Sequence, residues 1–178
     1  AYLEGANLQN ANLEGANLSN AILTGAILRN VELEDSILDN VVRDEAMGKR
    51  LQDGPKTLAQ LLEVHKRWIA TAGREGHQMD LSGFDLRDIR DLAHYPMTAM
   101  RAVKATFLGL DLTKANIQSA NLDYSDFRDC NLQRADLRGS SFKGVQMARA
   151  DLTGANFGPL KFDTPEGHGV RLQRVNLS

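Results

Sequence analysis

The residues best suited to chemistry in this chain of 178 residues are four histidines and one cysteine. His65, His77, His94 and His168 could act as general acids, general bases or metal ligands if the fold supplied partners for them. None of them has a second histidine or a cysteine at the spacing of a zinc site, and Cys130 stands alone. We therefore expect no metal site, and we interpret Cys130 as a small core residue instead of a nucleophile.

Carboxylates and glycines could supply acid–base pairs or phosphate-binding loops, but here both are spread evenly along the chain. Gly5, Gly15 and Gly25 recur at multiples of five positions, which is typical of turn residues and not of a phosphate loop. Aspartates and asparagines follow the same spacing, so no two carboxylates are singled out as a hydrolytic pair. The sequence therefore predicts that the protein is not an enzyme and binds no cofactor.

The elements that must carry these residues are set by a five-residue period. A large apolar residue occupies the centre of each unit, and a small residue stands two positions before it. The central positions are Leu3, Leu8, Leu13, Leu18, Leu23, Leu28, Leu33 and Leu38 in a first run, and Phe107, Leu112, Ile117, Leu122, Phe127, Leu132, Leu137, Phe142, Met147, Leu152, Phe157 and Phe162 in a second. Because five matches neither the helical nor the strand period, the chain must turn repeatedly to keep these residues inside.

Units such as Ala6-Asn7-Leu8 and Ala120-Asn121-Leu122 resemble the A-[D/N]-L-x-x signature of pentapeptide-repeat proteins. The resemblance covers residues 1–43 and about 79–178. It implies an all-β solenoid, a right-handed quadrilateral β-helix with four pentapeptides per coil and coils about 4.8 Å apart. Positions twenty apart should then stack, and on this register we expect Leu172 and Leu177 to continue two of the columns beyond a loop at 163–169.

One α-helical insertion is expected to interrupt the solenoid, because residues 44–78 leave the period. Thr57 and Gln60 have the spacing of a capping box, and apolar residues then recur at helical intervals, which predicts a helix over about 57–72. The expected organisation is N-terminal coils at 1–43, the insertion at 44–78 and C-terminal coils at 79–178. The period slips by one residue near Ile89, so we expect 88–104 to form the least regular coil.

Apolar residues replace asparagine at some outward-facing positions of the first run, and the insertion helix has an apolar stripe of its own. Two interpretations remain open: the helix packs on the exposed strip or covers a coil end, or the helix and the strip together bind a partner protein. The residues of this candidate interaction surface are Ile22, Ile27, Ile37, Val42, His65, Lys66, Arg67 and Trp68.

The charge is distributed unevenly, with a net charge of −5 over residues 1–44, +1 over 45–80 and +2 over 81–178. No continuous basic stripe runs along the chain, so we expect no direct nucleic-acid binding. No apolar stretch approaches the length of a membrane span and no secretory signal is present, so we expect no membrane partner and a cytoplasmic location.

Two functional hypotheses follow. The first is a non-catalytic scaffold that docks a protein partner whose identity the sequence does not give. The second is a DNA-mimic modulator of a type II topoisomerase. It follows from the resemblance, because some pentapeptide-repeat proteins protect DNA gyrase from quinolones by presenting an acidic rod that resembles DNA. The chain begins at Ala1 and ends at Ser178 inside repeats without polar caps, so we expect a longer natural chain or oligomerisation through uncapped coil ends.

Overall fold

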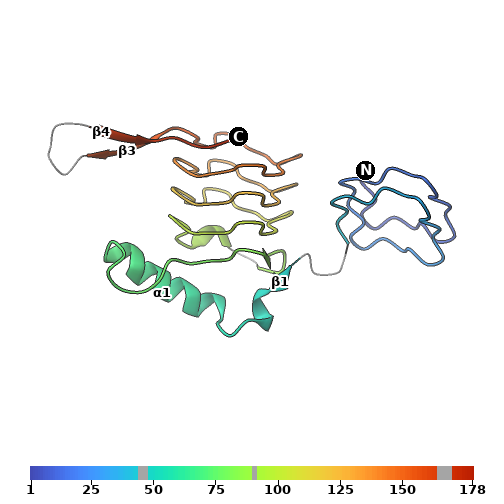
Figure 1. The fold of residues 1–178 in the computed structure, drawn as a ribbon, viewed down its shortest axis with the longest axis horizontal. Coiled ribbons are helices and arrows are strands. Elements are labelled where there is room, and N and C mark those ends of the chain that lie inside the picture. The colour runs from blue at the N-terminus through green and yellow to red at the C-terminus, as the bar shows by residue number, and fades with distance from the viewer. Residues whose placement is uncertain (44–47, 90–91, 164–169) are drawn as a thin grey trace. The chain divides into compact units, whose positions relative to one another are not determined.

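The computed structural model describes residues 1–43, 48–89, 92–163 and 170–178. The chain divides into two compact units, Ala1–Met47 and Gly48–Ser178. Both are built from coils (Figure 1).

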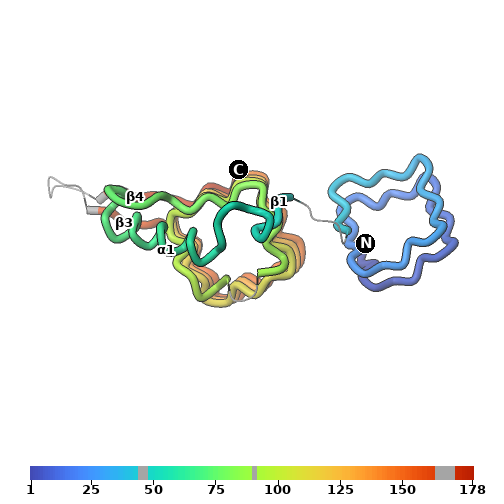
Figure 2. The backbone as a smooth tube through the Cα atoms, turned by 90° about the horizontal axis from the view of Figure 1, so that it is seen from below, coloured from blue at the N-terminus to red at the C-terminus, as the bar shows by residue number. Residues whose placement is uncertain are grey.

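The second unit is a stack of coils held together by parallel backbone pairing between residues twenty positions apart. Arg101 pairs with Asn121 and Asn121 pairs with Ser141, so four five-residue sides complete one coil, as the four-sided outline in Figure 2 shows. Each corner needs one residue in the left-handed region, and Lys104 (φ 56°) and Tyr124 (φ 62°) adopt it although neither is glycine. The chain therefore turns at every fifth residue.

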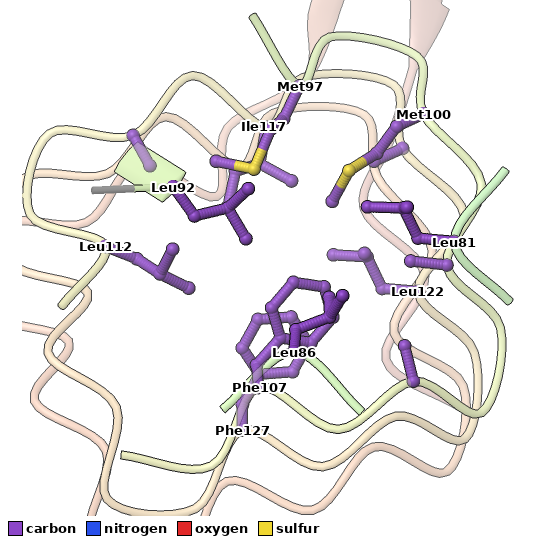
Figure 3. Close-up of a cluster of buried hydrophobic side chains, with 14 of the residues drawn as sticks. Leu81, Leu86, Leu92, Met97, Met100, Phe107, Leu112, Ile117, Leu122 and Phe127 are labelled. Carbon is purple, nitrogen blue, oxygen red and sulfur yellow. The ribbon is translucent and has the colours of Figure 1, made fainter. Parts of the chain in front are cut away.

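The interior of this stack contains the central and small residues of the repeat. Phe107 and Phe127 are fully buried and stack with ring centroids 4.3 Å apart, and Leu112 and Ile117 are equally buried on neighbouring sides. Figure 3 shows these side chains converging on the axis of the coil. Their burial removes apolar surface from water, which is the main term that stabilises the stack.

The first coil of the second unit is one residue longer than the others. Asp80 pairs with Arg101, and Asp85 pairs with Thr106, at a separation of 21 residues instead of 20. The predicted slip by one residue is thus confirmed. The irregular part contains the short 3-10 helix η2 (Leu92–His94), whose Leu92 side chain is buried in the core.

The insertion adds to the same core. Strand β1 (Lys49–Arg50) pairs in parallel with β2 (Phe84–Asp85), and a 3-10 turn, η1 (Leu51–Asp53), leads to the helix α1 (Leu58–Ala70). Thr57 caps α1, and its side chain and that of Gln60 form a reciprocal capping box. Leu51 and Leu62 belong to the core of the stack, so the described part of the expected insertion at 44–78, from residue 48 onward, lies within the second unit.

The C-terminal residues depart from the predicted register. Strands β3 (Leu160–Asp163) and β4 (Val170–Gln173) pair in an antiparallel ribbon, and Asn176 then pairs with Ser141. Leu177 consequently belongs to the column of Phe142, and Leu172 lies on the ribbon with 46% of its surface exposed. The prediction that both leucines continue their original columns was wrong, because Asn176 pairs with a residue 35 positions earlier, which is three pentapeptides more than one coil of twenty residues. The expected loop at 163–169 lies almost entirely outside the described residues.

The first unit follows the same plan over two coils. Ile22 pairs with Tyr2 on one side and Val42 on the other, and Leu18 and Leu23 are buried. Its remaining central leucines are only half-buried.

Candidate interaction surface

His65 joins α1 to the first coil of the second unit. Its ring is completely buried, the backbone N–H of Met79 donates to Nδ1 at 3.0 Å, and Nε2 lies 3.0 Å from the Thr98 carbonyl oxygen. Because Nδ1 accepts a hydrogen bond, the proton must be on Nε2, which donates to Thr98. Burial lowers the pKa of His65 by disfavouring the charged ring, and the hydrogen bond to Thr98 opposes this shift. His65 is therefore a neutral structural link.

Trp68 stacks on His65 with ring centroids 5.7 Å apart and is half-buried. Its indole lies beside Gly73 just after the helix. Lys66 and Arg67 are exposed, and we call the side of α1 that carries them its outer side. Of the four residues predicted on the helix, two therefore hold it in place and two face solvent.

The four predicted apolar residues of the first unit do not form one strip. Ile22 and Val42 stack on one side of the coil and are buried, with 4% and 0% of their surfaces exposed. Ile27 and Ile37 each lie on a different side of the coil, where they pair with Asn7 and Asn17. About half of each isoleucine is exposed, 49% and 47%. The expectation of a continuous strip was wrong because each step of five residues moves to the next side of the coil.

A hollow that the sequence did not predict lies where the insertion meets the first coil. Its volume is about 370 Å³. It is lined by Arg50, Leu51, Gln52, Gly54, Pro55, Lys56, Thr57, Leu58, Asp85, Asp88 and Ile89. The buried Asp85 carboxylate is not free there, because it accepts hydrogen bonds from the Arg87 guanidinium at 2.7 to 3.1 Å.

A second hollow of about 520 Å³ adjoins the irregular side of the first coil. It shares Ile89 with the first hollow and is also lined by Ala93, His94, Leu110, Asp111 and Lys114. The Thr113 hydroxyl and backbone N–H both donate to Asp111, and they hold the pKa of that carboxyl below its usual range. The sequence signal for both hollows was the loss of the five-residue period in 44–78 and 88–104, which locates them without identifying their lining.

The repeats identify the family. A family model described as pentapeptide repeats matches residues 1–40 and 120–158 in eight copies. The chain is a pentapeptide-repeat protein. No curated protein sequence matches it.

Several solved structures of pentapeptide-repeat proteins are similar to this one. HetL of the cyanobacterium Nostoc sp. strain PCC 7120, described as involved in heterocyst differentiation regulation, is 22% identical, with 96% of this chain and 64% of that chain covered and a TM-score of 0.25. Rfr23 of the cyanobacterium Cyanothece 51142 is 19% identical, with 100% and 88% covered and a TM-score of 0.27. QnrB1, described as a plasmid-mediated fluoroquinolone resistance protein, is 18% identical, with 99% and 85% covered and a TM-score of 0.20. The chain thus spans about two thirds of the length of HetL, and the family assignment rests on the repeats.

The cysteine and the histidines of this pentapeptide-repeat protein do not gather into one site within the described residues. The Cys130 thiol is buried, donates to the Phe107 carbonyl oxygen at 3.1 Å, and has a pKa raised by burial to about 12. His77 and His94 are exposed, while His168 lies outside the described residues. Within the described part of the chain, no three His, Cys, Asp or Glu side chains are grouped so that they could hold a metal ion. A search of the same residues finds no helix long and apolar enough to span a membrane.

Proposed function

We propose that this right-handed quadrilateral β-helix is a non-catalytic scaffold that docks a protein partner through the outer side of α1. The observation that carries the proposal is the division of labour on α1 between Leu62 and His65, which fix the helix to the stack, and Lys66 and Arg67, which point to solvent. The backbone of a helix fixed in this way is already ordered, so binding through its outer side costs little further backbone entropy.

The hydrogen bonding of the candidate reactive groups supports a non-catalytic role. Cys130 is buried with a raised pKa, and both ring nitrogens of His65 are engaged. A general base or nucleophile needs a free, accessible atom at the site of reaction. These two residues contribute to the core instead.

The experiment compares charge reversals on and off the helix. Lys66→Glu/Arg67→Glu changes the outer side of α1, whereas Lys104→Glu/Lys143→Glu makes the same charge change at exposed positions of the coils. We expect a protein that co-purifies with the wild type and with the coil variant to be lost from the helix variant, and the purified partner to reproduce this order in a binding titration. Equal capture by all three proteins contradicts the role of α1. Trp68→Ala is a poorer test because that side chain packs on His65.

A second candidate, a modulator of a type II topoisomerase, is favoured by the acidic first unit. Glu14 and Glu34 lie twenty residues apart, so they occupy equivalent positions on adjacent coils, and Glu32 and Asp35 are exposed on the same unit. Such a surface presents carboxylates at the spacing of the coils, about 4.8 Å. A gyrase supercoiling assay, with and without a quinolone, tests it; unchanged supercoiling and unchanged drug inhibition at micromolar protein rule it out.

A further inference from the structure

The antiparallel ribbon β3–β4 lies outside the coils of the second unit (Figure 1). Its base is fixed to the corner directly below it, since the Gln173 side-chain amide donates to the Gly139 carbonyl oxygen at 2.6 Å. Leu160, the first residue of β3, also packs close to Gly139. The ribbon therefore has an anchored base and an outer part that projects from the stack.

Each strand of the ribbon has a cation next to a large apolar residue. Lys161 is opposite Leu172, and Phe162 is opposite Arg171. Residues opposite each other in an antiparallel pair lie on the same face, so each face presents one cation and one apolar side chain. All four side chains are exposed, with 44% of Phe162 and 46% of Leu172 accessible.

The outer edges of the ribbon are available for pairing. β3 and β4 form a two-stranded sheet, and among the described residues neither strand pairs with a third. An edge strand presents a row of backbone donors and acceptors that can template another strand. A two-stranded ribbon is only marginally stable by itself, so a third strand would add both hydrogen bonds and stability.

We propose that the ribbon is a docking site for an extended segment of a partner protein in which acidic and apolar side chains alternate. A third strand beside β3 would place an acidic side chain next to Lys161 and an apolar one, on the other face, next to Phe162. Beside β4 the same alternation matches Arg171 and Leu172. In sequence, residues 160–174 contain three cations, Lys161, Arg171 and Arg174, and two acids, Asp163 and Glu166, so the net charge of this stretch is positive and also favours an acidic segment.

The position of α1 is consistent with this site. The side-chain amide of Gln78, which follows α1, donates to the Ala99 carbonyl oxygen, and Ala99 occupies the same corner column as Gly139 two coils away. Figures 1 and 2 both place α1 and the ribbon on the same side of the stack. The inference rests on the proposed scaffold function, but it assigns binding to a different element.

The test uses the full chain and a fluorescent peptide of alternating glutamate and valine, with a lysine–valine peptide of equal length as the control. We expect the acidic peptide to bind in an anisotropy titration, and we expect its affinity to fall as the salt concentration is raised. The double variant Lys161→Glu/Arg171→Glu should bind the acidic peptide about tenfold more weakly or worse, and should prefer the basic peptide. Hydrogen exchange should slow at β3 or β4 when the acidic peptide is bound. The circular dichroism of the variant should match that of the wild type, since both changed residues are exposed.

No binding of the acidic peptide, equal binding of the two peptides, or protection confined to other segments overturns the proposal. Lys66→Glu/Arg67→Glu serves as the control that separates this site from α1. If that variant loses its natural partner but retains the acidic peptide, the two surfaces act independently. If the ribbon variant retains the peptide unchanged, the ribbon is excluded and the α1 proposal stands.

Discussion

The backbone N–H of Met79 donates to Nδ1 of His65, and this bond fixes α1 to the residue just before Asp80, which pairs with Arg101 in the first coil of the second unit. The bond is possible only while the imidazole is neutral, because a protonated ring has no acceptor atom. The Thr98 carbonyl oxygen occupies the other ring nitrogen. Both of these hydrogen bonds between the helix and the coil thus depend on a single titratable ring.

Acid should weaken this attachment. Burial holds the pKa of His65 in the folded protein below the ordinary histidine value of about 6.5, so the unfolded state binds the proton more readily. Its stabilising contribution is complete above about pH 6.5 and is lost as pH falls from there through the folded pKa, with a slope of at most about 1.4 kcal/mol per pH unit. Denaturant unfolding between about pH 7.5 and 5 measures this slope. The His65→Gln variant should be less stable, and its unfolding free energy should lack this dependence on pH. An unchanged slope in the variant would assign the pH dependence to other groups.

The buried ion pair between Asp126 and Arg128 should matter more than its exposed counterpart. The Arg128 side chain is 2% exposed and binds Asp126 through both Nε and Nη2, while the equivalent Asp136–Arg138 pair has an arginine side chain that is 36% exposed. Asp126→Asn removes the carboxylate from a buried guanidinium and should cost about 3 kcal/mol of unfolding free energy. Asp136→Asn should cost much less, because water solvates Arg138. Equal losses in chemical denaturation contradict this ranking.

Much of the fold could be predicted from the sequence because the repeat constrains side-chain size at each position. The corners, the buried column from Phe107 to Phe127 and the slip before Leu92 all follow from residue type and spacing. The exit of β3 and β4 could not be predicted in this way. The segment that leaves the stack contains a whole number of pentapeptides, so Leu172 and Leu177 keep the phase they would have in an unbroken coil.

The candidate site was less accessible to sequence analysis. Trp68 and His65 are large residues on an apolar helix stripe, and only the structure separates them, as packing residues, from Lys66 and Arg67. Ile22 and Ile27 lie on different sides because one coil contains twenty residues, and the expectation of a strip did not take this into account. The two hollows are formed by irregular backbone, whose path the five-residue period does not predict.

The small inward position should accept alanine or serine with little change in stability. The Ser125 hydroxyl bridges the coil below, accepting from the Ala105 N–H at 3.1 Å and donating to the Ala102 carbonyl oxygen. Ala135 occupies the equivalent position one coil above Ala115. There the two backbone groups bond directly, since the Ala115 N–H donates to the Leu112 carbonyl oxygen at 3.0 Å. Ser125→Ala can restore that direct bond and should cost less than about 1 kcal/mol, below the usual penalty for an unpaired buried group.

The control for this position is size. Ala135→Leu introduces a large side chain at an equivalent, fully buried site and should cost about 1–3 kcal/mol or more through overpacking. Chemical denaturation of both variants checks the contrast. A loss above about 2 kcal/mol for Ser125→Ala means that the direct bond does not re-form.

The anchor of the ribbon can be tested at one corner. A Cβ at Gly139 would lie 2.9 Å from Leu160 Cδ1 and 3.2 Å from Gln173 Cγ, whereas one at Gly109 would meet nothing within 4 Å. Both glycines have a left-handed φ, of 69° and 71°, so alanine at either should pay a similar backbone cost of about 1 kcal/mol. Only Gly139→Ala must also displace the base of the ribbon. We expect hydrogen exchange at β3 and β4 to accelerate in Gly139→Ala and to stay unchanged in Gly109→Ala, with weaker binding of the glutamate–valine peptide in the first variant alone. Identical exchange in the two variants shows that the ribbon is held elsewhere.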